Sequence, residues 1–302
     1  MSSNRSVKNA AKNLHGSKVC PMDNSEIPDP LFREAVSAID AGDVTTLERL
    51  LTAHPELVRD RLDYGEGYFK NPYLLWFVAE NPIRQGTLPK NIAEITRAIL
   101  GAAERQQLES LRAQLDSTLE LVSSGRVARE CGVQGELIDV LVAAGADPNG
   151  ALVSALAHRE LRAAERLLER GARLTLLAAV CLGRTEEVPR LLRETSPEER
   201  QAALTGAALY GKAETIHLLI DRGVDLHAFS PAGLHSHGTP LHHAVDSGSL
   251  DAVQVLVEAG AALCTRDRVH QGTPLDWADH LKHPEIAAYL RAAEGRPAAT
   301  SR

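Results

Sequence analysis

The tetrapeptide Gly-Thr-Pro-Leu occurs twice in the C-terminal third of this 302-residue chain, at 238–241 and at 272–275. The two copies lie 34 residues apart, and a repeat of that length is typical of solenoids whose repeats are single supersecondary units. After the first copy, apolar residues recur at helical spacing, at Leu250, Val253, Leu256 and Val257. This repeat constrains the fold of the chain more than any other feature of its sequence, and it predicts a solenoid of helical hairpins.

The same pattern can be followed back to the start of the chain. Paired apolar residues at the end of an amphipathic stretch recur eight times, at Leu51, Ile99, Val142, Leu168, Leu192, Ile220, Val257 and Leu290. Several of these stretches end in a glycine, as expected for a left-handed C-terminal cap, at Gly145, Gly171, Gly223 and Gly260. The periodicity predicts about eight helical hairpins, each of which buries its apolar face against its neighbours.

The order turn, helix, turn, helix and closing glycine, with Thr-Pro-Leu-His at 239–242, resembles the ankyrin repeat family. The resemblance extends over roughly 29–293 and is strongest in 201–293. It implies an all-α, ankyrin-type solenoid of about eight stacked hairpins with short turn and finger connections. We expect a flexible lead-in at 1–28, a solenoid at 29–294 and a frayed tail at 295–302. Within the solenoid, 201–293 holds typical repeats and 31–200 holds degenerate ones.

The unequal spacing of the eight apolar pairs predicts where the repeats depart from the family. Spacings of 24 to 28 residues in the middle leave no room for a protruding finger, so we expect about 146–205 to be finger-poor with a bare concave edge. The longer spacings near the start predict extended loops at 61–72 and 80–91, and a longer or extra helix at 101–118. Pro189 falls in the first turns of a short helix, where it removes a backbone donor.

The resemblance also implies roles for the repeat motif. Thr239 would cap the first helix, Pro240 would occupy its first turn, and the His242 ring would bond backbone groups and tie neighbouring repeats. Asp276 replaces this histidine in the last copy, which predicts a capping repeat with weaker lateral bonding. The motif residues are Thr239, Pro240, Leu241, His242, Thr273, Pro274 and Leu275.

Composition excludes several classes of protein. The chain is 44% hydrophobic with a net charge of −7, and its basic residues are scattered, which argues against nucleic acid or an anionic membrane as partner. Its four cysteines form no Cys-x-x-Cys pair, which argues against zinc ribbons and favours a reducing cytoplasm. We expect a cytoplasmic monomer without cofactor or metal.

Two segments stand out from the repeats. The aromatic loop, residues 61–77, holds six aromatic residues of a chain that is 4% aromatic, and it predicts either a local core or a binding patch. The His-rich finger, residues 227–237, begins a run to 243 that concentrates histidines. Those histidines are either solvent-facing, in contact with a partner, or ligands of a metal ion.

We therefore expect a non-catalytic module that binds a protein partner on its concave finger and inner-helix surface. The candidate contact residues are Tyr64, Tyr68, Phe69, Phe229, His235, His237, His243, Asp246, Arg266 and Asp267. One alternative is a metal-dependent or enzymatic protein that uses residues 227–243, with Asp246 or His270 completing the coordination. Another is a small-ligand sensor closed by the aromatic loop. A triad of Ser236, His243 and Asp246 can be drawn, but a hairpin solenoid lacks the strand-to-helix turn of a nucleophile elbow.

Overall fold

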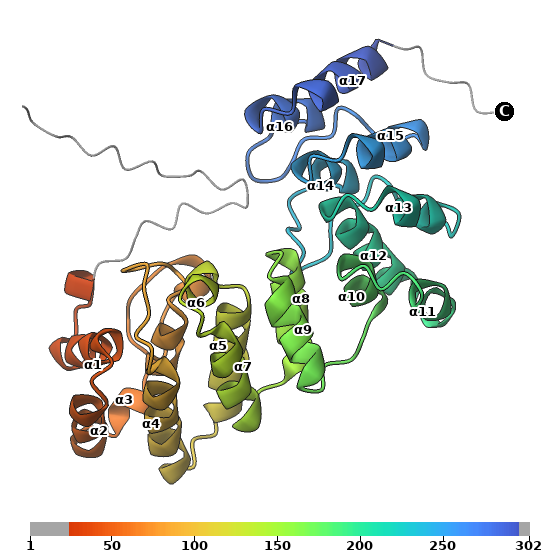
Figure 1. The fold of residues 1–302 in the computed structure, drawn as a ribbon. Helices are drawn as coiled ribbons and strands as arrows, with labels where there is room; N and C mark the ends of the chain where they lie inside the picture. Colours follow the sequence, from red (N-terminus) through yellow and green to blue (C-terminus); the bar gives the residue numbers. More distant parts are fainter. Residues whose placement is uncertain (1–23, 296–302) are drawn as a thin grey trace, which may run out of the picture.

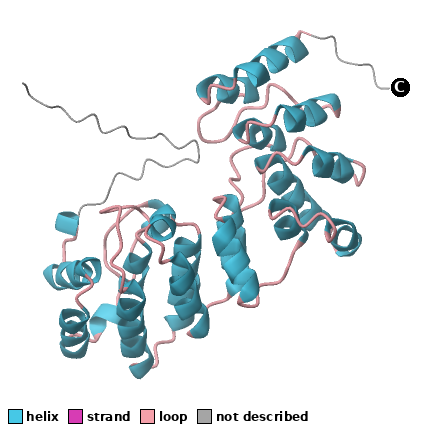
Figure 2. Ribbon diagram, in the orientation of Figure 1, coloured by secondary structure: helices cyan, strands magenta, loops and turns pink. Residues whose placement is uncertain are grey.

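The computed structural model describes residues 24–295, and this range is entirely helix and loop, without a strand (Figure 2). Almost all of the expected tail and most of the expected lead-in lie outside the described residues. The boundary of the lead-in at residue 28 needs correction. Asn24–Glu26 forms a short 3-10 helix (η1), Ile27 is buried, and the Asn24 amide donates to the Asp40 carboxylate at 2.5 Å. The packed solenoid therefore includes residues 24–28.

Eight helical hairpins stack into an arc, and this confirms the predicted ankyrin-type, all-α architecture (Figure 1). The first helices of the hairpins lie along the inner side of the arc: α1 (Pro30–Ala41), η3 (Leu74–Ala79), α5 (Leu111–Ser123), α8 (Pro148–Ala157), α10 (Leu176–Cys181), α12 (Pro197–Leu209), α14 (Pro240–Asp246) and α16 (Pro274–His280). The second helices lie outside: α2 (Val44–Ala53), α4 (Ile92–Arg105), α7 (Gln134–Ala143), α9 (Leu161–Glu169), α11 (Val188–Glu194), α13 (Ala213–Ile220), α15 (Leu250–Glu258) and α17 (Pro284–Glu294). Each of the eight apolar pairs falls on one of these second helices.

Local chemistry fixes where the helices begin. Ser196 and Glu199 form a reciprocal capping box at the start of α12, and prolines occupy the first turn of five inner helices. Pro189 lies in the first turn of α11, so the backbone donor that it removes would have had no acceptor within the helix. Pro189 therefore does not remove a hydrogen bond from α11.

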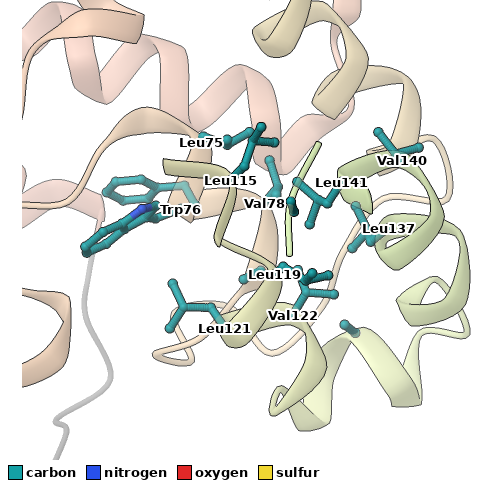
Figure 3. Close-up of a cluster of buried hydrophobic side chains, with 14 of the residues drawn as sticks. Leu75, Trp76, Val78, Leu115, Leu119, Leu121, Val122, Leu137, Val140 and Leu141 are labelled. Atoms are coloured by element: carbon teal, nitrogen blue, oxygen red, sulfur yellow. The ribbon is translucent and has the colours of Figure 1, made fainter. Parts of the chain in front are cut away.

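The buried side chains form two core clusters. One runs from Ile27 to Cys181 and also includes Leu234, and the other runs from Leu176 to Leu290. The two clusters meet along α10, whose buried residues are divided between them. The inner helices α8 and α10 contact each other less extensively than the other neighbouring inner helices do. Figure 3 shows part of the N-terminal core, where Leu75 and Val78 of η3 meet Leu115 and Leu119 of α5. The stack of hairpins is therefore continuous, but its packing is weakest at the middle, between α8 and α10.

The N-terminal repeats carry the insertions. Three short helices interrupt them: α3 (Glu56–Arg59), η2 (Gly67–Phe69) and α6 (Arg126–Glu130). The predicted loop at 80–91 is confirmed, and 61–72 is a loop apart from η2. The helix predicted at 101–118 is present in part, because this segment holds the end of α4, a break at 106–110 and the start of α5. Leu115 and Leu119 therefore belong to an inner helix and not to an insertion.

The middle repeats lack fingers, as their short spacing predicts. Only residues 170–175 join α9 to α10, and only 195–196 join α11 to α12. The C-terminal repeats carry two long connections, which we name the first finger (221–239, between α13 and α14) and the second finger (259–273, between α15 and α16).

Candidate protein-binding surface

Backbone hydrogen bonds hold both fingers in shape. In the first finger, Ser230 N–H donates to the Gly238 carbonyl at 3.0 Å. In the second finger, Asp267 N–H donates to the Gly272 carbonyl at 2.9 Å. The two fingers are also joined, because Arg268 N–H donates to the carbonyl of His237 in the first finger at 2.9 Å. A surface built on these fingers is pre-formed, so little conformational entropy is lost when a partner binds.

Asp267 organises the tip of the second finger from the inside. Its side chain is fully buried and accepts N–H groups from Val269 at 2.9 Å, His270 at 2.6 Å, Gly272 at 2.8 Å and the Trp277 indole at 3.0 Å. Burial by itself would raise the pKa of Asp267, but these hydrogen bonds outweigh burial and lower the pKa from 3.8 to about 2. Asp267 therefore cannot contact a partner directly, which corrects its assignment as a contact residue.

His242 ties the last two repeats together, as the resemblance implies. Its Nδ1 lies 3.2 Å from Thr239 N and 2.8 Å from Thr239 Oγ1, while its Nε2 lies 3.1 Å from the Gly272 carbonyl oxygen. The ring therefore donates from Nε2 and accepts at Nδ1. Burial lowers the pKa of His242, which favours this neutral tautomer. Asp276 forms the equivalent capping box with Thr273 but has no donor with which to reach a further repeat.

The other histidines of the first finger pack inward. His243 is fully buried with Nε2 2.8 Å from Ser230 Oγ, and His237 is 9% exposed with its ring centroid 5.8 Å from that of Trp277. Neither ring is available to a partner, so their assignment as contact residues is corrected. His243 also engages Ser230 in place of Ser236, and the drawn triad is not assembled. Among residues 24–295, no group of three or more His, Cys, Asp or Glu residues is placed to hold a metal ion.

The first finger folds back across the middle of the arc onto α8. Leu234 is 2% exposed and belongs to the N-terminal core cluster, far from it in sequence. His235 Nε2 lies 2.8 Å from the Ala157 carbonyl oxygen at the end of α8. Arg159 also donates to Asp246 of α14 at 2.9 Å. We name this set of contacts the clasp. The concave edge of the finger-poor repeats, expected to be bare, is thus partly covered.

The exposed residues of the surface lie at the tip of the second finger. Arg266 and Arg268 are exposed, and the Val269 side chain is 52% exposed. The Arg268 guanidinium carbon lies 4.0 Å from the centroid of the half-buried Phe229 ring of the first finger. Arg266 and Phe229 were expected here from the sequence. Arg268 and Val269 were missed, although their position beside Arg266 in a finger was a usable signal.

The aromatic loop forms a local core. Phe69 is 2% exposed and packs against Trp76 and Phe77, with ring centroids 5.9 and 5.3 Å away. Its assignment as a contact residue is therefore corrected. Tyr64 is half-buried, whereas Tyr68 is 53% exposed and donates its hydroxyl hydrogen bond to Asn81 Oδ1 at 2.9 Å. Tyr68 is thus the residue of this loop that a partner could reach most directly.

A cavity of about 480 Å³ opens between α8 and the loop before α10, away from the aromatic loop. Its lining is mostly apolar, with Asn149, Leu152, Val153, Leu156, Arg173 and Thr175. The small-ligand alternative placed a pocket beside the aromatic loop, and the structure places this cavity at the weaker interface between α8 and α10 instead.

Comparisons with known proteins agree with this architecture. A model described as ankyrin repeats (3 copies) matches residues 176–267 and 207–299. Human cyclin-dependent kinase inhibitor 2A is 36% identical over 124 residues, which are 40% of this chain and 77% of that protein. The chain belongs to the ankyrin repeat family. Rat cyclin-dependent kinase 4 inhibitor B is also similar to this ankyrin repeat protein, at 32% identity over 43% of the chain and 99% of the inhibitor.

Another relative is matched over a small part of its own length. An Arabidopsis thaliana protein described as a putative E3 ubiquitin-protein ligase, XBAT31, is 34% identical over 37% of the chain and 24% of its own length. The family model and these matches cover less than half of the chain. Within residues 24–295, the repeat protein has no helix that combines the length and the apolar character needed to cross a bilayer.

Proposed function

We propose that this protein is a non-catalytic binding module that holds a protein partner on the concave side of the arc, against the two fingers. The observation that carries the proposal is the pre-formed double finger, in which inward-facing side chains fix the backbone and leave Arg266, Arg268 and Val269 exposed. Partner surfaces of this kind combine a few aromatic or arginine anchors with a rigid frame. Phe229 and Tyr68 add half-buried and exposed aromatic area on the finger and the aromatic loop.

The family membership supports binding as the activity and leaves the partner open. The relatives are named as kinase inhibitors in two cases and as a putative ligase in another, so their names do not point to one kind of partner. We propose a single protein partner. We also propose that the protein is a monomer and that it is located in the cytoplasm. The cytoplasmic location is supported by the free thiols of Cys131, Cys181 and Cys264.

The proposal is tested by affinity capture from native lysate, with purified cyclin-dependent kinase 4 as one defined probe. The intact chain is compared with a finger variant, Arg266→Ala with Val269→Glu, and with an outer-face control, Leu161→Gln. Leu161 begins α9 and is 40% exposed, so its substitution alters the outer face without touching the fingers.

We expect a protein that is retained by the intact chain and by the Leu161 variant but lost from the finger variant, because only the latter changes the proposed surface. Circular dichroism checks that both variants remain folded. Equal retention by all three chains, or loss only from the Leu161 variant, would place the binding surface elsewhere. A chain that retains nothing at low salt contradicts the proposal.

A further inference from the structure

The tip of the second finger carries a local reversal of charge. Residues 266–270 read Arg-Asp-Arg-Val-His in a chain of net charge −7. The Asp267 carboxylate is turned inward onto backbone N–H groups and an indole, so the acidic group of this segment is fully buried. The exposed charges of this tip are therefore the guanidinium groups of Arg266 and Arg268.

Arg268 differs from most other arginines of the chain. Fifteen described arginines, Arg159 among them, pair with a carboxylate within 4.0 Å, whereas Arg268 has no such pair within residues 24–295. Its guanidinium instead stacks on Phe229 at 4.0 Å, and its backbone is fixed by the bond to His237. Stacking holds the guanidinium plane while the N–H groups on its edge stay available to a ligand.

An apolar residue completes the patch. Val269 follows Arg268 directly and is one of the most exposed large apolar side chains of residues 24–295. Its backbone N–H is held by Asp267 at 2.9 Å, so its position is as fixed as that of Arg268. A ligand that meets both residues must offer an anion and an apolar group side by side.

From this geometry, and resting on the proposed function, we infer that the platform of Arg268 and Phe229 binds a side-chain carboxylate of an acidic protein segment. Val269 contacts an apolar side chain next to that carboxylate, and Arg266 adds attraction at longer range. The planar guanidinium matches a carboxylate with two parallel hydrogen bonds. A nucleic acid is disfavoured as the partner, because two exposed arginines on a chain of negative net charge can neutralise few backbone phosphates.

The test uses the full chain and a defined probe, a short peptide of repeated Asp-Glu-Leu-Gly. Binding is followed by fluorescence anisotropy and by the NMR signal of the Arg268 Nε–Hε group, which also detects millimolar affinity. Three probes of equal length provide the comparisons: the amide peptide of repeated Asn-Gln-Leu-Gly, a phosphoserine peptide and oligouridylate.

We expect the acidic peptide to shift the Arg268 signal and to bind more tightly than the other three probes. Arg268→Ala should weaken this binding about tenfold, which is the size expected for a charge-assisted hydrogen-bonded pair. Arg268→Lys keeps the charge but loses the planar fork, so it should restore only part of the affinity. Arg162→Ala, a matched exposed arginine on the outer helix α9 and outside both fingers, should leave the affinity unchanged.

The inference would be overturned if the intact and Arg268→Ala chains bound the acidic peptide with equal affinity, or if the amide peptide bound equally well. It would also be overturned if the Arg268 NMR signal did not shift at millimolar peptide. Tighter binding of the phosphoserine peptide or of oligouridylate would overturn the choice of a carboxylate. An equal loss of affinity in Arg162→Ala would show that net charge alone attracts the peptide. A captured partner that depends on the finger variant but is retained by Arg268→Ala would leave the proposed function standing without this platform.

Discussion

At the scale of single residues, the side chains that shape the surface are largely hidden beneath it. Asp267 and His242 use hydrogen bonds to backbone groups of the second finger, and neither is exposed. The backbone N–H and C=O groups of a finger loop would otherwise form hydrogen bonds with water in many loop conformations. A buried carboxylate that accepts hydrogen bonds from several of these N–H groups restricts the loop to one conformation. The exposed residues Arg268 and Val269 are thus positioned by a neighbour that no partner touches.

Substitution of Asp267 by asparagine should destabilise the protein in a pH-dependent way. The pKa of this carboxyl is lowered from 3.8 to about 2 in the folded state. Its stabilisation is therefore fully present above about pH 4 and is lost as the pH falls toward about 2, with a full value of about 2 kcal/mol. Urea unfolding of the intact chain and of the Asp267→Asn variant should differ by about this amount near neutral pH, and the difference should shrink in acid.

Asp279→Asn is the matched control, because Asp279 is exposed on α16 and, among residues 24–295, forms an ion pair only with the exposed Arg291. Its effect on the free energy of unfolding should stay below about 1 kcal/mol. A difference for Asp267→Asn that stays constant down to about pH 2 would show that the carboxylate charge is not the source of its stabilising effect.

At the scale of elements, the hairpins are unequal in their packing. α10 and α11 span only Leu176–Cys181 and Val188–Glu194, and α11 packs mainly against its own partner α10. The outer helices α13 and α15, by contrast, pack against each other. At α12, a Cβ on Gly206 would lie 2.5 Å from Leu177 Cδ1, so the inner helices remain closely packed where the outer ones separate. The local stability of the second helices should therefore vary along the arc.

We expect the backbone amides of α11 to exchange hydrogen faster than those of α15. The reason is packing, because Pro189 occupies a position where it costs no hydrogen bond. Hydrogen exchange followed by mass spectrometry on the intact chain measures this directly, with α13 as an internal reference. Protection of α11 equal to that of α15 would contradict the argument.

At the scale of the whole molecule, the clasp spans the place where the two core clusters meet. Leu234 of the first finger is buried in the N-terminal cluster, and Tyr210 of α12's C-terminal cap donates to the Leu156 carbonyl of α8 at 2.8 Å. Arg159 adds an ion pair to Asp246 and a bond to the Leu209 carbonyl at 2.9 Å. These contacts join α8 to α12, α14 and the first finger, and we expect them to hold the curvature of the arc.

Leu234→Ala should open the arc as well as destabilise it. Loss of the buried side chain is expected to cost about 2 to 4 kcal/mol, and the radius of gyration from small-angle scattering should increase because the clasp loses its apolar anchor. Leu256→Ala in α15 is the control, since Leu256 is equally buried but lies within one cluster. It should lower stability by a similar amount without changing the radius. An unchanged radius for Leu234→Ala would show that the clasp does not hold the curvature.

The sequence by itself determined the local and periodic features of this protein. The eight apolar pairs located the eight second helices, and the short spacings located the finger-poor middle. These two features depend on residues within one or two repeats, so their spacing is enough to read them. The bonding of one repeat to the next by His242 was implied by the resemblance of the Thr-Pro-Leu-His motif to the ankyrin repeat family.

Only the tertiary structure decided which polar and aromatic residues face a partner. Phe69, His237, His243 and Asp267 looked like surface residues in the sequence and are buried, because their neighbours come from other elements. The His235 bond to Ala157 joins residues 78 positions apart, and the Arg159 pair with Asp246 joins residues 87 positions apart. No repeat period encodes such contacts, since they join residues of repeats that are not neighbours in the sequence.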